Sequence, residues 1–129
     1  MFRHLPLALI ASLALSTTAA QTVPPLGEMR AKVDAFVRRA YPAVDPARTH
    51  VEYADINSDG EPEAFVIIRD RASCGEDGCA LVLELGEPAA REIAAFAGGE
   101  LRALQTKSGS WRDIMLDGRR LRWRNGAYE

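Results

Sequence analysis

The sequence has few of the residues from which catalytic and transition-metal sites are usually built. Its 129 residues include two cysteines and two histidines, and only nine are aromatic (four Phe, two Trp and three Tyr). A zinc site would need ligands beyond the two cysteines, and His50 is the only histidine after residue 4. The sequence contains no G-x-S-x-G, H-E-x-x-H or glycine-rich phosphate-binding motif. We therefore do not expect an enzyme.

Strong charge of one sign is also lacking. Sixteen Lys and Arg residues stand against eighteen Asp and Glu residues, which gives a formal net charge of -2. Such a balance shows no bias toward nucleic acids or membrane surfaces. We expect a monomer that does not bind nucleic acid.

The first twenty residues have the pattern of an export signal. Arg3 and His4 precede an apolar run from Leu5 to Leu15, and small residues follow up to Ala20. The run is shorter than the roughly twenty residues needed to cross a bilayer, and the sequence has no second long apolar run. We predict a signal peptide over residues 1–20, and a periplasmic or secreted protein without a membrane anchor.

The rest of the chain has the length of one domain, over residues 26–129, after a mobile lead-in at 21–25. Apolar residues at helical spacing predict an amphipathic helix from Leu26 to Tyr41, which Pro42 ends. Short β-rich runs separated by turn signals then predict seven strands. They are His50–Ala54, Ala64–Arg71, Ala80–Leu85, Arg91–Phe96, Leu101–Gln105, Trp111–Leu116 and Arg119–Arg124.

The expected fold class is α+β, with one N-terminal amphipathic helix packed on a meandering antiparallel β-sheet. The short connections between the predicted strands favour antiparallel hairpins over parallel crossovers. Residues 87–97 are ambiguous, because their alanines are also compatible with a helix; we favour a strand there.

The final hairpin can be predicted in detail, because Asp117-Gly118 is a strong type I′ turn signal. It would pair Ile114 with Leu121 and Leu116 with Arg119, and would continue to a pair of Arg112 with Trp123. The core face would then carry Ile114, Leu116, Leu121 and Trp123. On the other face we expect an ion pair of Asp113 with Arg122 and a cation–π contact of Trp111 with Arg124. Asn125-Gly126 repeats the turn signal and would bring Tyr128 beside Trp123.

The most informative motif is the acidic stretch from Asp55 to Glu63. It places oxygen-bearing side chains at alternate positions and a glycine, Gly60, where the chain must turn. An all-oxygen cage of this kind is what Ca²⁺ selects. The expected ligands are the side chains of Asp55, Asn57, Asp59 and Glu63, together with the carbonyl of Glu61. Position 12 of an EF-hand loop would be Val66, so the motif is not an EF-hand.

Two interpretations of this loop remain open. In the first, it binds Ca²⁺, which stabilises a hairpin and performs no catalysis. In the second, it is a turn held by Asx hydrogen bonds, with solvated charges and no ion. Several carboxylates within nine residues repel each other when no cation is present, which favours the first.

Cys74 and Cys79 lie between two apolar runs in the sequence C-G-E-D-G-C. Cysteines that face each other across a hairpin have the Cα separation that a disulfide prefers. We therefore predict a structural disulfide in an oxidising compartment. A catalytic redox pair is the alternative, but its usual spacing is C-x-x-C.

A further candidate surface is the arginine-rich C-terminal hairpin. Trp111, Arg120, Arg122 and Arg124 would form a face able to bind a protein partner. The alternative is that these arginines are the solvated face of a strand.

The order of these motifs along the chain is similar to that found in a group of known proteins. A D-x-N-x-D-G-x-x-E loop, a C-G-x-x-G-C segment, S-G-S-W-R-D-I and W-x-x-x-x-Y follow one another from Tyr53 to Tyr128. The chain resembles small exported proteins of Gram-negative bacteria that share this order, and the loop alone resembles the calcium loops of FG-GAP repeats. The resemblance implies an exported α+β domain with a disulfide hairpin, but no reaction.

We therefore expect a small exported binding or structural module, stabilised at its acidic loop by Ca²⁺. The alternative function is a periplasmic inhibitor or immunity-type protein that binds a hydrolase through the C-terminal hairpin.

Overall fold

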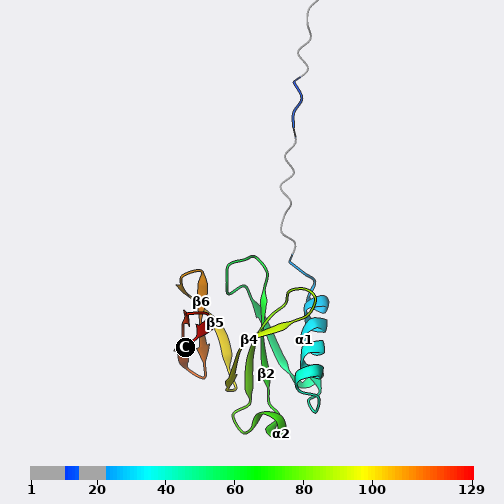
Figure 1. Cartoon of the computed structure of the whole chain (residues 1–129), viewed down its shortest axis with the longest axis vertical. Coiled ribbons are helices and arrows are strands. Elements are labelled where there is room, and N and C mark those ends of the chain that lie inside the picture. Colours follow the sequence, from blue (N-terminus) through cyan, green and yellow to red (C-terminus); the bar gives the residue numbers. More distant parts are fainter. Residues whose placement is uncertain (1–10, 15–22) are drawn as a thin grey trace, which may run out of the picture.

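A computed structural model describes residues 11–14 and 23–129. The signal peptide expected over residues 1–20 lies outside the described residues except for 11–14, which form no helix or strand. The described chain is an α+β structure in which antiparallel strands predominate (Figure 1). None of its helices is long and apolar enough to cross a membrane.

The helical elements are α1 (Leu26–Ala40), the 3₁₀ turn η1 (Pro46–Arg48) and the four-residue α2 (Arg71–Cys74). Among the described residues α1 is the only helix longer than two turns, and it follows twenty-five residues of chain rather than beginning at the N-terminus. Its buried residues Met29, Val33, Phe36 and Val37 recur at helical spacing, whereas Leu26 is exposed.

The strands form three antiparallel sheets rather than the single one expected. The first sheet contains β1 (His50–Ala54), β2 (Glu63–Ile68), β3 (Cys79–Glu84) and β4 (Arg91–Ala97) in sequence order. The second contains β5 (Leu101–Ser108), β6 (Trp111–Leu116) and β7 (Arg119–Leu121), and the third contains β8 (Trp123–Arg124) and β9 (Ala127–Tyr128). Of the ambiguous residues 87–97, Arg91–Ala97 form the strand β4, and residues 87–90 belong to no helix or strand.

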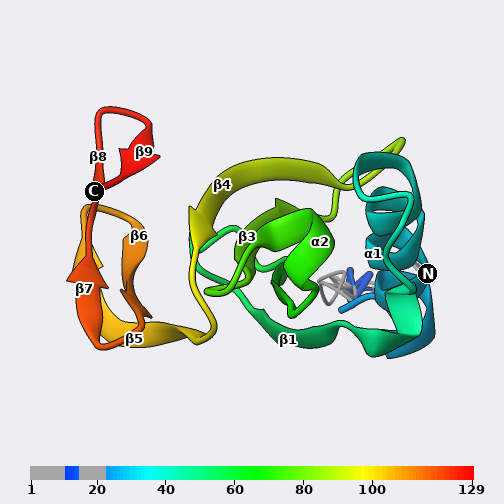
Figure 2. The same cartoon turned by 90° about the horizontal axis from the view of Figure 1, so that it is seen from below.

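Strand β2 is buried along its whole length, because it contributes to two hydrophobic clusters. Ala64, Val66 and Ile68 belong to a first cluster with Val33 and Val37 of α1 and with residues of β3. The intervening Phe65 and Ile67 belong to a second cluster with Ile114, Leu116 and Leu121 of the C-terminal strands. The four-stranded sheet accordingly lies between α1 and strands β5–β7 (Figures 1 and 2).

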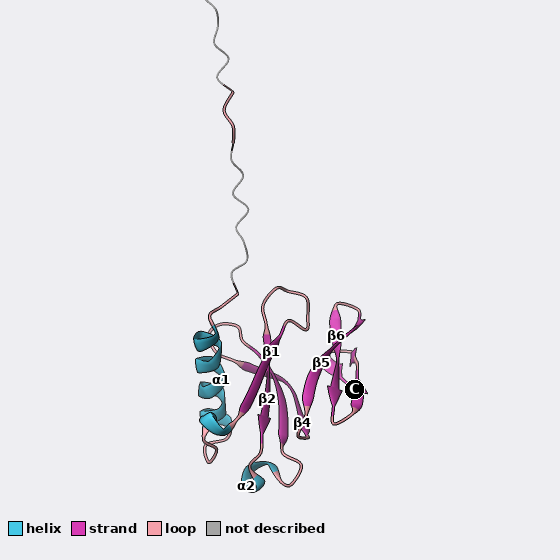
Figure 3. Ribbon diagram, turned by 180° about the vertical axis from the view of Figure 1, so that it is seen from behind, coloured by secondary structure: helices cyan, strands magenta, loops and turns pink. Residues whose placement is uncertain are grey.

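Three predicted strands differ from the expected bounds by more than one residue. The strand expected at Leu101–Gln105 continues to Ser108. The strand expected at Ala64–Arg71 ends at Ile68, and α2 follows it, because the Asp70 side chain accepts a hydrogen bond from the Ser73 amide and caps a turn. The strand expected at Arg119–Arg124 is interrupted at Arg122, whose backbone exchanges two hydrogen bonds of 2.9 Å with Glu129. Figure 3 shows the short helix α2 beyond the end of β2.

The predicted turns of the C-terminal hairpins are confirmed. Asp117 and Gly118 both have positive φ, and Ile114 pairs with Leu121 and Leu116 with Arg119 as expected. The pairing of Arg112 with Trp123 was wrong, since the interruption at Arg122 moves Trp123 into the third sheet. There it pairs with Tyr128 across the Asn125-Gly126 turn, which confirms that contact.

Candidate metal centre

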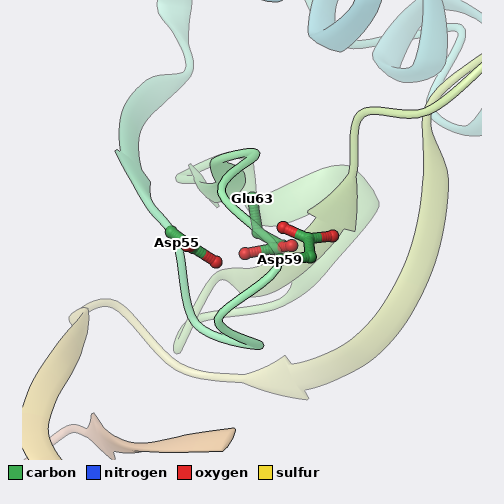
Figure 4. A group of neighbouring side chains, drawn as sticks. All are labelled: Asp55, Asp59 and Glu63. Carbon is green, nitrogen blue, oxygen red and sulfur yellow. The ribbon is translucent and has the colours of Figure 1, made fainter. Parts of the chain in front are cut away.

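The acidic loop connects β1 to β2, at a point where Ala54 pairs with Glu63. Asp55, Asp59 and Glu63 each direct a side-chain oxygen to the inside of the loop, and these oxygens lie within 4.8 Å of one another (Figure 4). Asp55 is half-buried, Asp59 is exposed and Glu63 is buried. This acidic group could hold a metal ion.

The aspartates also shape the loop. Asp55 accepts hydrogen bonds from the amides of Ser58 (3.0 Å) and Gly60 (2.9 Å), and Asp59 accepts one from the amide of Glu61 (2.8 Å). Gly60 has a φ of 85°, a conformation that glycine adopts without steric cost. These Asx hydrogen bonds are compatible with both interpretations of the loop, because a carboxylate oxygen can accept an N–H and still bind a cation.

Glu63 distinguishes this loop from an ordinary acidic turn. Only 1% of the residue is exposed, and its Oε2 accepts a hydrogen bond of 2.8 Å from the Ile56 amide. Burial and the nearby charges of Asp59 and Asp55 raise the pKa of Glu63 to about 7, although the Ile56 hydrogen bond opposes them.

No cationic side chain of the described residues forms an ion pair with this acidic group. A buried carboxylate without a counter-charge is unfavourable, so the protein lowers its cost by protonation or by binding a cation.

The structure groups three of the five expected ligand residues. The side chain of Asn57 bonds to Asp59, with Nδ2 donating to the Asp59 carboxylate at 3.1 Å and Oδ1 accepting from the Asp59 amide at 3.2 Å. Glu61 is exposed, and its amide donates to Asp59. Both residues remain next to the acidic group in the loop.

The sequence did not reveal that this loop lies against the C-terminal strands. The Ile56 carbonyl accepts a hydrogen bond of 2.7 Å from the Arg112 amide, and the Ser58 hydroxyl donates one of 2.9 Å to the Ser110 carbonyl. The Ile56 side chain is fully buried in the second cluster. An isoleucine within the polar stretch, between Asp55 and Asn57, was the only available signal.

Among the described residues, Asp113 on β6 is the second buried carboxylate, and its environment is the opposite of that of Glu63. Its ion-pair partner is Arg120, at 2.6 Å, and not the expected Arg122. Arg120 is opposite Met115, so it lies diagonally across the hairpin on the same face as Asp113. Burial alone would raise the pKa of Asp113, but hydrogen bonds from Thr106, Ser108 and Arg120 outweigh it and lower the pKa to about 2.

The expected contact of Trp111 with Arg124 is replaced by an aromatic stack. The rings of Trp111 and Trp123 are 3.8 Å apart and nearly parallel, and Tyr128 meets both of them edge-on. Of the expected partner face, Trp111 therefore lies in the stack and Arg120 is bound to Asp113, whereas Arg122 and Arg124 form no ion pair within the described residues.

The predicted disulfide between Cys74 and Cys79 is confirmed, with a Cα–Cα distance of 5.3 Å. His50 lies elsewhere, as the exposed first residue of β1, where its ring is 3.2 Å from Glu52. A cavity of about 390 Å³ beside His50 and Arg69 includes none of the three carboxylates of the acidic group.

Comparison with known proteins adds no functional information to this geometry. No family model, curated protein sequence or solved structure matches the chain.

Proposed function

We propose that this protein is a small exported binding or structural module whose β1–β2 loop binds Ca²⁺. The observation that carries the proposal is Glu63, a carboxylate with 1% exposure that has two other acidic side chains beside it and no cationic partner among the described residues. A bound cation would offset both its desolvation and the mutual repulsion of the three carboxylates.

The donor set favours Ca²⁺ over other metals. Every candidate ligand is an oxygen, which suits hard cations and not zinc or copper. Ca²⁺ accepts six to eight oxygens in flexible geometry, whereas Mg²⁺ demands a nearly ideal octahedron. In our proposal Asp55, Asp59 and Glu63 are the principal ligands. Asn57 and the Glu61 carbonyl join them when the ion binds, and water completes the shell.

Export is supported by independent features. The chain begins with the pattern of a signal peptide, and the Cys74–Cys79 disulfide suits an oxidising compartment. The order of its motifs resembles that of small exported Gram-negative proteins. Calcium sites in extracellular modules commonly have dissociation constants of about 10⁻⁴ to 10⁻³ M, a range that we adopt for this loop.

Isothermal titration calorimetry of the purified, disulfide-bonded protein tests the proposal. We expect Ca²⁺ to bind with a dissociation constant near 10⁻⁴ M, and Glu63→Gln to weaken binding at least about tenfold, because a principal charged ligand is lost. Asp77→Asn is the matched control, since it removes an exposed carboxylate from the disulfide loop. The absence of binding, or equal losses in both variants, would refute the site.

The alternative of a periplasmic inhibitor or immunity-type protein rests on the C-terminal hairpins. The half-buried stack of Trp111 and Trp123 lies beside two exposed arginines, Arg122 and Arg124, and such residues often anchor protein interfaces. Arg122→Ala and Arg124→Ala should abolish capture of a periplasmic hydrolase in a pull-down while leaving the fold intact. Arg48→Ala, at an exposed arginine of η1, should have no effect on capture.

A further inference from the structure

We infer that the acidic loop couples ion binding to the docking of the C-terminal hairpins, so that Ca²⁺ regulates the surface around Trp111 and Trp123. The inference rests on the proposed calcium site and adds what that site controls. It is carried by the contacts that join the loop to β6 and β9.

Ile56 is the central residue of this connection. Its amide donates to the Glu63 carboxylate at 2.8 Å, and its carbonyl accepts from the Arg112 amide at 2.7 Å. Its fully buried side chain packs in the second cluster, which contains Ile114 and Tyr128. Any change in the position of Glu63 or of the adjacent Asp55 therefore acts directly on a residue that holds the C-terminal strands.

Ser58 makes a second connection. Its amide donates to Asp55, which fixes Ser58 at a φ of 64°, and its hydroxyl donates to the Ser110 carbonyl at 2.9 Å. Lys107 reaches the same hydroxyl at 3.3 Å but forms no ion pair with the acidic group. The turn between β5 and β6 is thus attached to the loop by way of Asp55.

The contacts continue from the loop to the aromatic stack. The Arg112 carbonyl accepts a hydrogen bond of 2.7 Å from the Tyr128 hydroxyl, so the backbone of Arg112 bonds to Ile56 through its amide and to Tyr128 through its carbonyl. Tyr128 lies edge-on to Trp111 and Trp123, with ring centroids 6.2 Å and 5.1 Å away. One continuous set of contacts therefore runs from Glu63 to the tryptophan pair.

Through these contacts, Ca²⁺ binding at the loop and docking of the C-terminal hairpins each favour the other. Without an ion, three carboxylates within 4.8 Å repel one another and favour a wider loop, which pulls Ile56 and Ser58 away from the hairpin. An ion holds the carboxylates together and so favours docking. By linkage, the factor by which Ca²⁺ strengthens docking is also the factor by which docking strengthens Ca²⁺ binding, so weaker docking contacts lower the affinity for Ca²⁺.

Matched variants test this reciprocity. Ile56→Val trims the contact with the C-terminal strands, whereas Ile68→Val makes the same change in the first cluster, away from the loop. Both remove one buried methylene, so both are expected to fold. We expect the calcium dissociation constant, measured by calorimetry, to rise about threefold or more in Ile56→Val, through partial loss of that contact, and to stay unchanged in Ile68→Val.

Ser58→Ala provides a second pair, with Ser73→Ala as its control at an exposed serine for which no side-chain hydrogen bond is seen. Loss of one hydrogen bond to the Ser110 carbonyl should weaken Ca²⁺ binding about threefold. Hydrogen exchange supplies a readout that does not depend on affinity. In the wild type, Ca²⁺ should slow exchange of the Arg112 amide more than that of amides in the β2–β3 ladder.

The outcomes separate the two proposals. If the wild type binds no Ca²⁺, the calcium site and the coupling both fail. If it binds Ca²⁺ but the members of each pair have equal affinities and Arg112 exchange does not respond, the site stands and the coupling is overturned.

Discussion

Glu63 and Asp113 are two carboxylates with the same burial and opposite electrostatic environments. Glu63 is 1% exposed and Asp113 is 0% exposed. The protein supplies Asp113 with two hydroxyl donors and a guanidinium, which keep its pKa near 2, whereas it gives Glu63 one amide donor and two acidic neighbours, and the pKa rises to about 7. Asp113 is satisfied from within the protein, whereas Glu63 has no cationic partner among the described residues, and in our proposal a cation from solution takes that place.

The largest effect that we expect is a dependence of the unfolding free energy on pH, caused by Glu63. A folded-state pKa raised from 4.5 to about 7 stabilises the fold below pH 4.5, and this contribution is lost as the pH rises through 7. In EDTA, urea unfolding between pH 5 and 8 should therefore show a loss of up to about 3 kcal/mol.

Glu63→Gln is the control for this measurement, because it cannot titrate. Its stability should be nearly flat over the same pH range, and saturating Ca²⁺ should flatten the wild-type profile as well. A wild-type profile in EDTA that matches that of Glu63→Gln would show that Glu63 is not destabilised by its surroundings.

A smaller effect is expected when Asp113 loses its ion-pair partner. Arg120→Ala removes the guanidinium at 2.6 Å and should lower the free energy of unfolding by about 2 kcal/mol, the size expected for hydrogen bonds to a charged group. Because the wild-type pKa of Asp113 is lowered from 3.8 to about 2, its contribution is present above pH 4 and is lost as the pH falls through 2. Acid titration of the circular dichroism signal should show a smaller loss in the variant over that range.

The smallest effect on stability is expected at Arg122 and Arg124, in contrast to Arg120, which stabilises the fold through Asp113. Arg122 and Arg124 are exposed, and neither side chain forms an ion pair within the described residues. Arg122→Ala and Arg124→Ala should change the unfolding free energy by less than about 0.5 kcal/mol. A loss equal to that of Arg120→Ala in chemical denaturation would assign them a structural role.

Local signals explain what could be predicted from the sequence. Asp117-Gly118 and Asn125-Gly126 form tight turns in which all four residues have positive φ, so turn chemistry was enough to predict the residue pairs next to each turn. The helical spacing of Met29, Val33 and Phe36 similarly located α1. The three carboxylates of the candidate site were visible because they lie within nine residues.

The missed features depend on contacts between distant parts of the chain. Burial of Glu63 and Ile56 requires the C-terminal strands to cover the second face of β2, which no local pattern reports. The stack of Trp111 on Trp123 depends on the interruption at Arg122, and this in turn depends on the pairing of Arg122 with Glu129. Tertiary packing therefore determines that Glu63, and not another acidic residue of the loop, is buried.

The thermal unfolding midpoint of the disulfide-bonded protein in EDTA and in about 1 mM Ca²⁺ shows whether the acidic loop binds Ca²⁺, with Asp59→Asn and the control Asp77→Asn measured alongside. At a dissociation constant near 10⁻⁴ M, this calcium concentration should stabilise the fold by about 1.4 kcal/mol. We predict a higher midpoint with Ca²⁺ in the wild type and in Asp77→Asn, and no shift in Asp59→Asn. Identical midpoints with and without Ca²⁺ in all three proteins would contradict Ca²⁺ binding by the β1–β2 loop, which would then be a turn held by its own hydrogen bonds.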